Sequence, residues 1–233
     1  MERRNRKRRR SLGWLYFLII VLIVMGVLVL IGYNNLVKKP REVYAQTSAE
    51  IVVSLQEASA LINKSVIDYR NKQISLETAK FDLQDASDIV RENQEKFLSM
   101  KDISSLKSVK DRLSYSIDNI DKTVDLATVY LDKQKISFDT EDWINYLTQT
   151  RQEFLNKLAE TGYDYYKNLA DEYSKKIDDK AVEFQTIQNE SEQAFSDYQQ
   201  SYLKIEKPLK ELEPWLSYFV DLESMRSKET GNE

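Results

Sequence analysis

The stretch from Leu12 to Ile31 constrains the chain most, because it is a run of uninterrupted apolar character with no charged residue. About twenty helical residues at ~1.5 Å rise per residue extend ~30 Å, which is the thickness of the hydrocarbon core of a bilayer. A helix on the surface of a soluble protein would carry polar residues at every third or fourth position. Residues 12–32 are therefore predicted to form a single transmembrane helix.

The residues that flank this segment predict its orientation. Trp14, Tyr16 and Tyr33 lie near its two ends, where amphipathic aromatic rings prefer the membrane interface. A cluster of basic residues precedes it, opposed by the single acid Glu2, and consists of Arg3, Arg4, Arg6, Lys7, Arg8, Arg9 and Arg10. Basic residues resist translocation, so the polybasic tail 1–11 is expected in the cytoplasm and residues 33–233 outside it. The same cations are expected to attract anionic lipid, at ~1 kcal/mol each.

A cleavable signal peptide is the alternative interpretation of the N-terminus. Its apolar region would run over only ~7–15 residues and end at a small-x-small cleavage site. The apolar run here is longer, and the nearest such site, Val43 to Ala45, lies well beyond it. An uncleaved signal-anchor is therefore favoured, and the protein is expected at a cell membrane with a single pass.

Charge and cysteine content restrict the domain outside the span. The whole chain has a net charge of −4. The first ten residues are strongly basic, so the residues beyond them are more acidic than the whole-chain value indicates. An acidic domain argues against a broad nucleic-acid-binding surface. The chain has no cysteine and hence no disulfide, which suits a bacterial cell envelope better than an animal cell surface.

The scarcity of turn residues predicts an all-α fold. Beyond Tyr33 the only glycines are Gly162 and Gly231, and sheets need many turns rich in Gly and Pro. Apolar residues recur three and four positions apart over long stretches, as in packed helices. The prediction is a short neck over 33–41, an extracytoplasmic antiparallel helical bundle or coiled coil of long helices over 42–225, and a polar tail over 226–233.

Helix boundaries follow from the apolar spacing and from capping residues. The first predicted helices cover residues 42–70, 76–100 and 103–135, with a turn at residues 71–73 and Ser75 at the start of the second helix. A new helix is predicted to start at Phe138–Trp143, where Asp139 suits an N-cap and Phe138 and Trp143 form a hydrophobic staple. Its periodicity continues to Lys207, so a break is expected at Gly162 or near residues 178–179. Pro208 is expected to end this helix.

The residue types that most enzymes need are missing from the sequence. There is no histidine and no cysteine, and the five glycines are not clustered into a phosphate-binding loop. Acidic residues do recur at helical spacing, at Asp82, Asp85, Asp88 and Glu92 and again at Asp118, Asp121 and Asp125. Such rows are typical of the solvated face of a helix. No enzyme activity, cofactor or metal is therefore expected.

Two groups of aromatic and apolar residues are candidates for contact with a partner. Trp143, Tyr146 and Tyr163 with Tyr165 and Tyr166 form either a core or an exposed binding patch. An amphipathic segment over 214–225 either docks on a partner or folds back on its own domain. Its candidate partner-binding residues are Trp215, Leu216, Phe219, Val220 and Leu222.

These features predict a membrane-anchored scaffold or adaptor that mediates protein–protein interaction or assembly at a cell envelope. Its expected partners are the lipid bilayer, another envelope or membrane protein, and a second copy of the chain through the helical seams; no nucleic acid is expected. One alternative is a sensor or regulatory subunit, which would act through a membrane partner because residues 1–11 are too few for a signalling domain. Another alternative is a secreted helical effector, if the apolar segment is cleaved.

Overall fold

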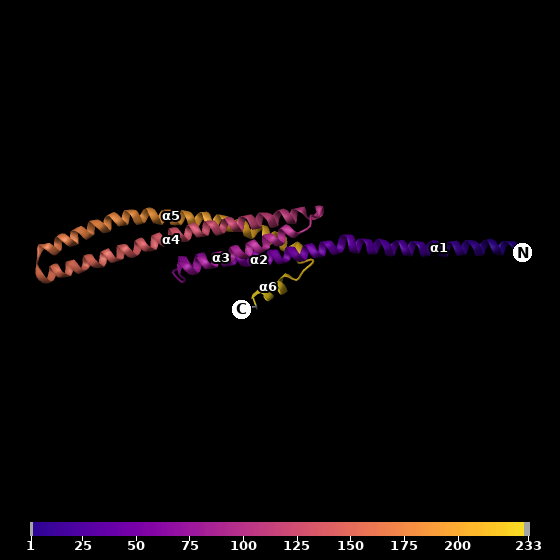
Figure 1. The fold of residues 1–233 in the computed structure, drawn as a ribbon, viewed down its shortest axis with the longest axis horizontal. Coiled ribbons are helices and arrows are strands. Elements are labelled where there is room, and N and C mark those ends of the chain that lie inside the picture. The colour runs from indigo at the N-terminus through magenta and orange to yellow at the C-terminus, as the bar shows by residue number, and fades with distance from the viewer. Residues whose placement is uncertain (1, 231–233) are drawn as a thin grey trace.

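The protein is helical over nearly its whole length (Figure 1). The computed structural model describes the backbone of residues 2–230 and the side chains of residues 16–227. Helix accounts for 92% of the structure, and the described residues contain no strand. The predicted all-α class is therefore confirmed.

The apolar segment and the first helix of the domain form one continuous helix. Helix α1 (Glu2–Tyr33) passes through a π-helical turn η1 (Asn34–Lys38) into α2 (Lys39–Arg70). Within it, the stretch from Tyr16 to Arg70 contains an apolar window long enough to cross a membrane. The large apolar side chains from residue 16 to 31 are exposed, and Figure 1 shows α1 projecting away from the other helices. The predicted neck is therefore helical and makes no flexible joint.

Pro40 gives a physical reason for the π-helical turn. A proline inside a helix lacks the N–H that would bond to the carbonyl of residue i−4, here Leu36, and its ring clashes with that carbonyl. The π-turn lies immediately before it, and the N–H of Lys39 donates to the carbonyl of Asn34, five residues back. A wider turn of this kind lets the chain remain helical past the proline.

A tight turn joins α2 to α3 (Leu76–Ser99) at the predicted place. Lys72 adopts a left-handed conformation with φ of 58°, and the N–H of Asn71 still donates to the carbonyl of Ile67 at 3.0 Å. Ser75 caps α3, because its hydroxyl accepts a hydrogen bond from the Thr78 N–H at 3.1 Å. The predicted break at residues 71–73 and the predicted cap are both confirmed.

The chain then crosses a short loop, passes a 3₁₀ turn η2 (Ser104–Leu106) and enters the long helix α4 (Lys107–Thr161). The helix start predicted at Asp139 is wrong, because residues 138–143 lie inside α4. A cap stabilises N–H groups that lack a partner, and inside a continuous helix those groups already bond to carbonyls four residues back. Asp139 instead pairs with Lys135 one turn earlier, and Phe138 packs on Tyr69 of α2 with ring centroids 5.7 Å apart.

Helix α4 ends with Gly162 as its C-cap, which is one of the two places where the sequence predicted a break. Gly162 has φ of 71°, a left-handed conformation in which only glycine avoids strain, and its N–H donates to the carbonyl of Leu158 at 2.8 Å. Helix α5 (Asp164–Leu216) follows at once and runs through residues 178–179 without a break.

The prediction that Pro208 ends the helix is wrong, since α5 continues through Pro208 and Pro214. A proline in a helix interior costs ~3 kcal/mol. Leu209, Leu212 and Leu216 follow Pro208 and are all buried, and full burial of one leucine contributes ~1.5–3 kcal/mol. Packing of these leucines therefore outweighs the local cost of the proline.

Helices α2, α3, α4 and α5 share one hydrophobic core. Ion pairs between α4 and α5 show the direction of these helices: Arg112 pairs with Glu211 at 2.5 Å, and Lys133 pairs with Glu190 at 2.7 Å, so α4 and α5 run in opposite directions. Between these pairs, the hydroxyls of Thr123 and Ser201 are 2.8 Å apart inside the core.

Helices α4 and α5 extend well past the end of α2 and α3 as a two-helix arm (Figure 1). Where α2 ends and the α2–α3 turn begins, Arg70 pairs with Glu192 of α5 at 2.8 Å and Lys72 pairs with Glu141 of α4 at 3.0 Å. We call residues 142–189 the projecting arm. Along it only Leu147 and Ala170 are buried, because a pair of helices covers each inward side chain from one side alone.

Two buried tyrosines in the core allow a matched test of side-chain hydrogen bonding. Tyr130 and Tyr198 are equally buried, and burial raises the pKa of both phenols. The Tyr198 hydroxyl donates to Asn63 Oδ1 at 3.1 Å, whereas the Tyr130 hydroxyl has no hydrogen-bond partner among the described residues. We expect Tyr198→Phe to lower the free energy of unfolding by ~1 kcal/mol and Tyr130→Phe to leave it unchanged or to raise it. Urea unfolding followed by circular dichroism measures both; equal losses would contradict the assignment.

Candidate functional site

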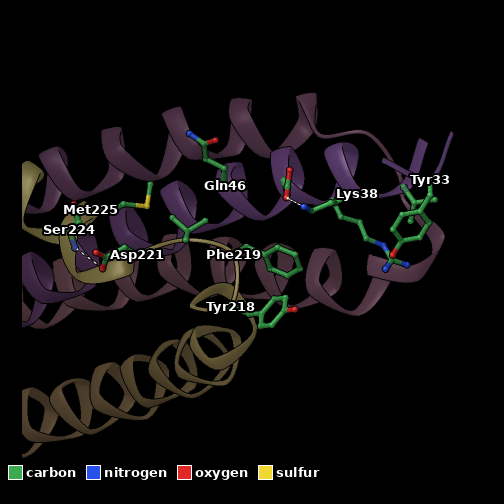
Figure 2. Close-up of a pocket in the computed structure, with 12 residues that line it drawn as sticks. Tyr33, Lys38, Gln46, Tyr218, Phe219, Asp221, Ser224 and Met225 are labelled. Atoms are coloured by element: carbon green, nitrogen blue, oxygen red, sulfur yellow. Dashed lines mark hydrogen bonds and ion pairs between the residues drawn. The ribbon is translucent and has the colours of Figure 1, made fainter. Parts of the chain in front are cut away.

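A groove lies between the start of α2 and the turn that follows α5 (Figure 2). It has a volume of about 1040 Å³. We call it the neck groove. One wall comes from the end of α1, the π-turn and the start of α2, and the other from residues 218–225. Its lining residues are Tyr33, Val37, Lys38, Arg41, Glu42, Gln46, Tyr218, Phe219, Val220, Asp221, Ser224 and Met225.

The turn over residues 217–221 forms the outer wall of the neck groove. It leads from α5 into α6 (Leu222–Thr230), and Asp221 caps α6 by accepting the Ser224 N–H on Oδ1 at 3.2 Å. Leu216 and Leu222, which flank the turn, are buried in the core, while Tyr218 is 83% exposed. The turn therefore has fixed ends and an exposed aromatic tip.

A polar clasp holds α6 against α2 and α5. Arg226 Nη2 donates to Gln56 Oε1 at 2.7 Å, and Gln56 Nε2 donates to Glu213 Oε1 at 2.8 Å. Arg226 also pairs with Glu213. Burial by itself would raise the pKa of Glu213, but the hydrogen bonds from Gln56 and Arg226 outweigh it and lower that pKa. The clasp thus fixes the turn beside the neck.

A second, smaller groove lies beside the neck, next to the loop between α3 and α4. Its volume is about 560 Å³, and Lys39, Pro40 and Tyr44 from α2 face Lys101 and Ile103 from the loop across it. Arg41 Nη2 donates to Ser105 Oγ at 3.3 Å, which ties the same loop to the neck. Burial, followed by the charges of Asp102 and Asp111, raises the pKa of Tyr44. Two turns far apart in sequence therefore border the neck.

The cations and anions around the neck differ in their partners. Glu42 pairs with Lys38 at 3.7 Å, and Asp102 pairs with Lys110 at 2.5 Å. Lys39, Arg41 and Lys101 are exposed and form no ion pair with any residue that the structure describes. Lys39, Arg41 and Lys101 thus keep their charge to offer a ligand, and the acids Asp111 and Asp221 likewise form no ion pair with a described residue.

The opposite end of the molecule carries a second exposed feature, the tip of the α4–α5 arm. Tyr163 and Tyr165 are exposed there, and the ring of Tyr165 lies 5.5 Å from that of Tyr166. Trp143 and Tyr146 stack on each other at 5.2 Å on the outside of the arm. Of the two interpretations left open by the sequence, the structure places these side chains outside the core, apart from the half-buried Tyr166.

The predicted site residues are distributed as follows. The polybasic residues at positions 3–10 and Trp14 lie outside the side chains that the structure describes. Tyr16 and Tyr33 are exposed on the helix surface. Leu216 and Leu222 are buried, and Trp215 and Val220 pack against the core, so the segment 214–225 folds back on its own domain rather than standing free.

Sequence reasoning found only part of the neck groove. It selected Tyr33 as an interface anchor and Phe219 and Val220 as candidate partner contacts, and all three line the groove. It missed Gln46 and Tyr218, because nothing in the local pattern shows that two segments more than 170 residues apart meet. The acidic rows on α3 and α4 bring no three acidic side chains together in a metal-binding group within the described part of the chain.

Comparisons of the chain with protein-family models, with curated proteins and with solved structures gave no match.

Proposed function

We propose that the protein is a single-pass membrane scaffold or adaptor. In this proposal residues 12–32 span the bilayer, the N-terminus is cytoplasmic, and residues 42–225 form an antiparallel helical bundle outside that binds another protein of the cell envelope. The observation that carries the proposal is the unbroken helix from Tyr16 to Arg70, which joins an exposed apolar segment directly to the core of the domain.

A continuous helix fixes the position of the domain relative to the apolar segment, whereas a flexible linker does not. The π-turn at the neck keeps helical backbone angles on both sides, with φ and ψ of −60° and −47° at Tyr33 and −56° and −46° at Lys39. The loop between α3 and α4 is tied to the neck by the hydrogen bond from Arg41 to Ser105, and α4 begins directly after this loop. Helix α4 has 55 residues, so the tip of the arm is held ~80 Å from the neck.

The tip of the arm is the proposed docking surface for the partner protein. Exposed tyrosines supply large contact area with little loss of side-chain entropy, and they are enriched in protein interfaces. Gly162 turns the chain between α4 and α5 and leaves Tyr163 and Tyr165 facing outward. An adaptor that holds such a tip at a fixed distance from the bilayer can position a second protein there.

Site-specific photo-crosslinking in cells tests this function. A photoreactive amino acid in place of Tyr163 is expected to give a discrete adduct in the membrane fraction, whereas one in place of Phe81, which is exposed to the same degree on α3, is not. The double variant Tyr163→Ser/Tyr165→Ser is expected to lose copurification of the crosslinked protein while its unfolding temperature stays unchanged.

The mass of the crosslinked adduct also distinguishes a second copy of the chain from a different partner protein. An adduct with twice the mass of the chain identifies a second copy, which is the homo-oligomeric form of the scaffold. An adduct of any other discrete mass identifies a different protein. The same adducts at Phe81 and Tyr163, or none at Tyr163, would contradict the proposal that the arm is the docking surface.

A further inference from the structure

The neck of the molecule carries the strongest unexplained feature, a ring of two turns around the point where the apolar segment meets the domain. We define the collar as residues 99–103 between α3 and α4 and residues 217–221 between α5 and α6. We propose that the collar rests on the phospholipid head groups of the bilayer that holds α1, with lipid phosphates bound by Lys39, Arg41 and Lys101 and with Tyr218 within the head-group layer. The inference rests on the proposed membrane anchor and adds a lipid-binding surface to it.

The height of the collar above the apolar segment supports this contact. The hydrocarbon core of a bilayer is ~30 Å thick, and head groups add ~5–8 Å on each side. If the span ends at Gly32, Lys39 and Arg41 lie ~10–14 Å further along the helix axis at 1.5 Å per residue. Long basic side chains extend toward the interface from such positions. Because the neck is helical, the collar cannot swing away from this height.

The charges around the neck favour phosphate as the group that binds there. Lys39 and Lys101 line the smaller groove together, and Arg41 lines the neck groove on the other side. These three cations form no ion pair with a described residue, while the nearby acids Glu42 and Asp102 are paired with Lys38 and Lys110. Asp221, the remaining acid of the collar, is engaged as the cap of α6. Basic residues close to a membrane surface are attracted to its anionic lipids.

Exposed aromatic and apolar side chains at the same level fit the chemistry of the interface. Tyr218 and Phe219 meet in a T-shaped contact with centroids 5.0 Å apart, and Figure 2 shows both rings at the neck beside Lys38. Tyr33, which lines the same groove, and Leu36 on the π-turn are also exposed. Tyrosine is enriched at membrane–water interfaces, where its ring is buried and its hydroxyl remains solvated. The collar thus combines cations with aromatic groups, as a head-group layer requires.

Because the chain has no cysteine, single-cysteine variants of the full chain give an unambiguous test. Tyr218→Cys places one thiol on the collar, and Tyr163→Cys, a similarly exposed tyrosine at the tip of the arm, is the matched control. Each variant is labelled with a fluorophore and reconstituted into vesicles of phosphatidylcholine and phosphatidylglycerol that contain a lipid with a nitroxide on its head group. We expect strong quenching at position 218 and none at position 163, ~80 Å away along α4.

A second arm of the experiment assigns the phosphate contacts. The triple change Lys39→Gln/Arg41→Gln/Lys101→Gln in the Tyr218→Cys background is expected to reduce the quenching and to remove its dependence on phosphatidylglycerol. Inorganic phosphate in the buffer, up to the concentration of lipid phosphate, should not displace the collar if bilayer head groups are the ligand; displacement would show a site for free phosphate and overturn the lipid assignment.

Vesicle flotation separates failure of this inference from failure of the membrane anchor. If the chain floats with the vesicles but the label at position 218 is quenched no more than the label at 163, the collar does not rest on the bilayer and the inference is wrong. If neither variant floats, the anchor itself is wrong. Unchanged quenching in the triple variant would overturn the role of the three cations.

Discussion

Replacing Leu22 and Ile23 together by lysine is expected to move the chain out of the membrane fraction. Both residues lie in the middle of the apolar segment, and both are exposed on α1, so no protein contact is lost with them. On an insertion scale, exchanging a large apolar residue for lysine at the centre of a transmembrane helix costs ~3–4 kcal/mol, and two exchanges cost ~6–8 kcal/mol. An energy of that size reverses the preference of a single span for the bilayer.

The matched control exchanges two exposed apolar residues for lysine outside the apolar segment. Val182 and Leu203 are both exposed on α5, where a lysine would extend into water. The variant Val182→Lys/Leu203→Lys is expected to remain in the membrane fraction after carbonate extraction, whereas the variant in the apolar segment is expected in the supernatant. If both variants remain in the membrane, the domain is held there by something other than α1.

The second large effect is expected at Leu216, which lies at the end of α5. The sequence left open whether this residue contacts a partner or folds back on its own domain, and the structure buries it completely in the core of that domain. Truncation of a buried leucine to alanine costs ~2–5 kcal/mol, because transfer energy is lost and a cavity remains. Leu216→Ala is therefore expected to lower the free energy of unfolding by this amount.

Leu203→Ala is the control, because Leu203 lies on the same helix and is 63% exposed. Its effect is expected to stay within ~0.5 kcal/mol. Urea unfolding of the full chain in detergent micelles, followed by circular dichroism, measures both variants. Equal stability of Leu216→Ala and Leu203→Ala would show that the end of α5 does not belong to the core and would restore the docking interpretation of residues 214–225.

Helical periodicity was sufficient to predict much of the fold. The spacing of apolar residues depends only on which face of a helix is buried, so the seams of α2 and α3 could be read directly from the sequence. Ser75 and Gly162 were also predictable, because a cap and a left-handed turn each restrict the residue type at one position.

The errors came from local signals that packing overrides. Asp139 and Trp143 resemble a helix start, but the helix before them does not end, so there are no free N–H groups to cap. Pro208 resembles a helix end, but burial of the leucines beyond it keeps α5 intact. Each motif predicts whether an isolated turn of helix would begin or end there. Packing in the core determines whether the helix continues through that turn.

The candidate sites were likewise only partly predictable from the sequence. The exposed tyrosines at the tip of the arm could be named from the sequence but not placed outside the core, because their spacing suits either position. The neck groove depends on the placement of residues 218–221 beside the start of α2. Burial of Leu216 and Leu222 and the polar clasp of Gln56, Glu213 and Arg226 hold the turn there. A tertiary contact of this kind has no signature within one segment.

The proposed orientation of the chain across the membrane is tested most directly by single-cysteine labelling. Asn5→Cys and Tyr163→Cys each introduce the only thiol of the chain, one before the apolar segment and one at the tip of the arm. Spheroplasts that express each variant are treated with a maleimide that cannot cross membranes, before and after permeabilisation. We predict that position 163 is labelled in intact spheroplasts and position 5 only after permeabilisation; labelling of position 5 and protection of position 163 in intact spheroplasts would contradict the proposed orientation.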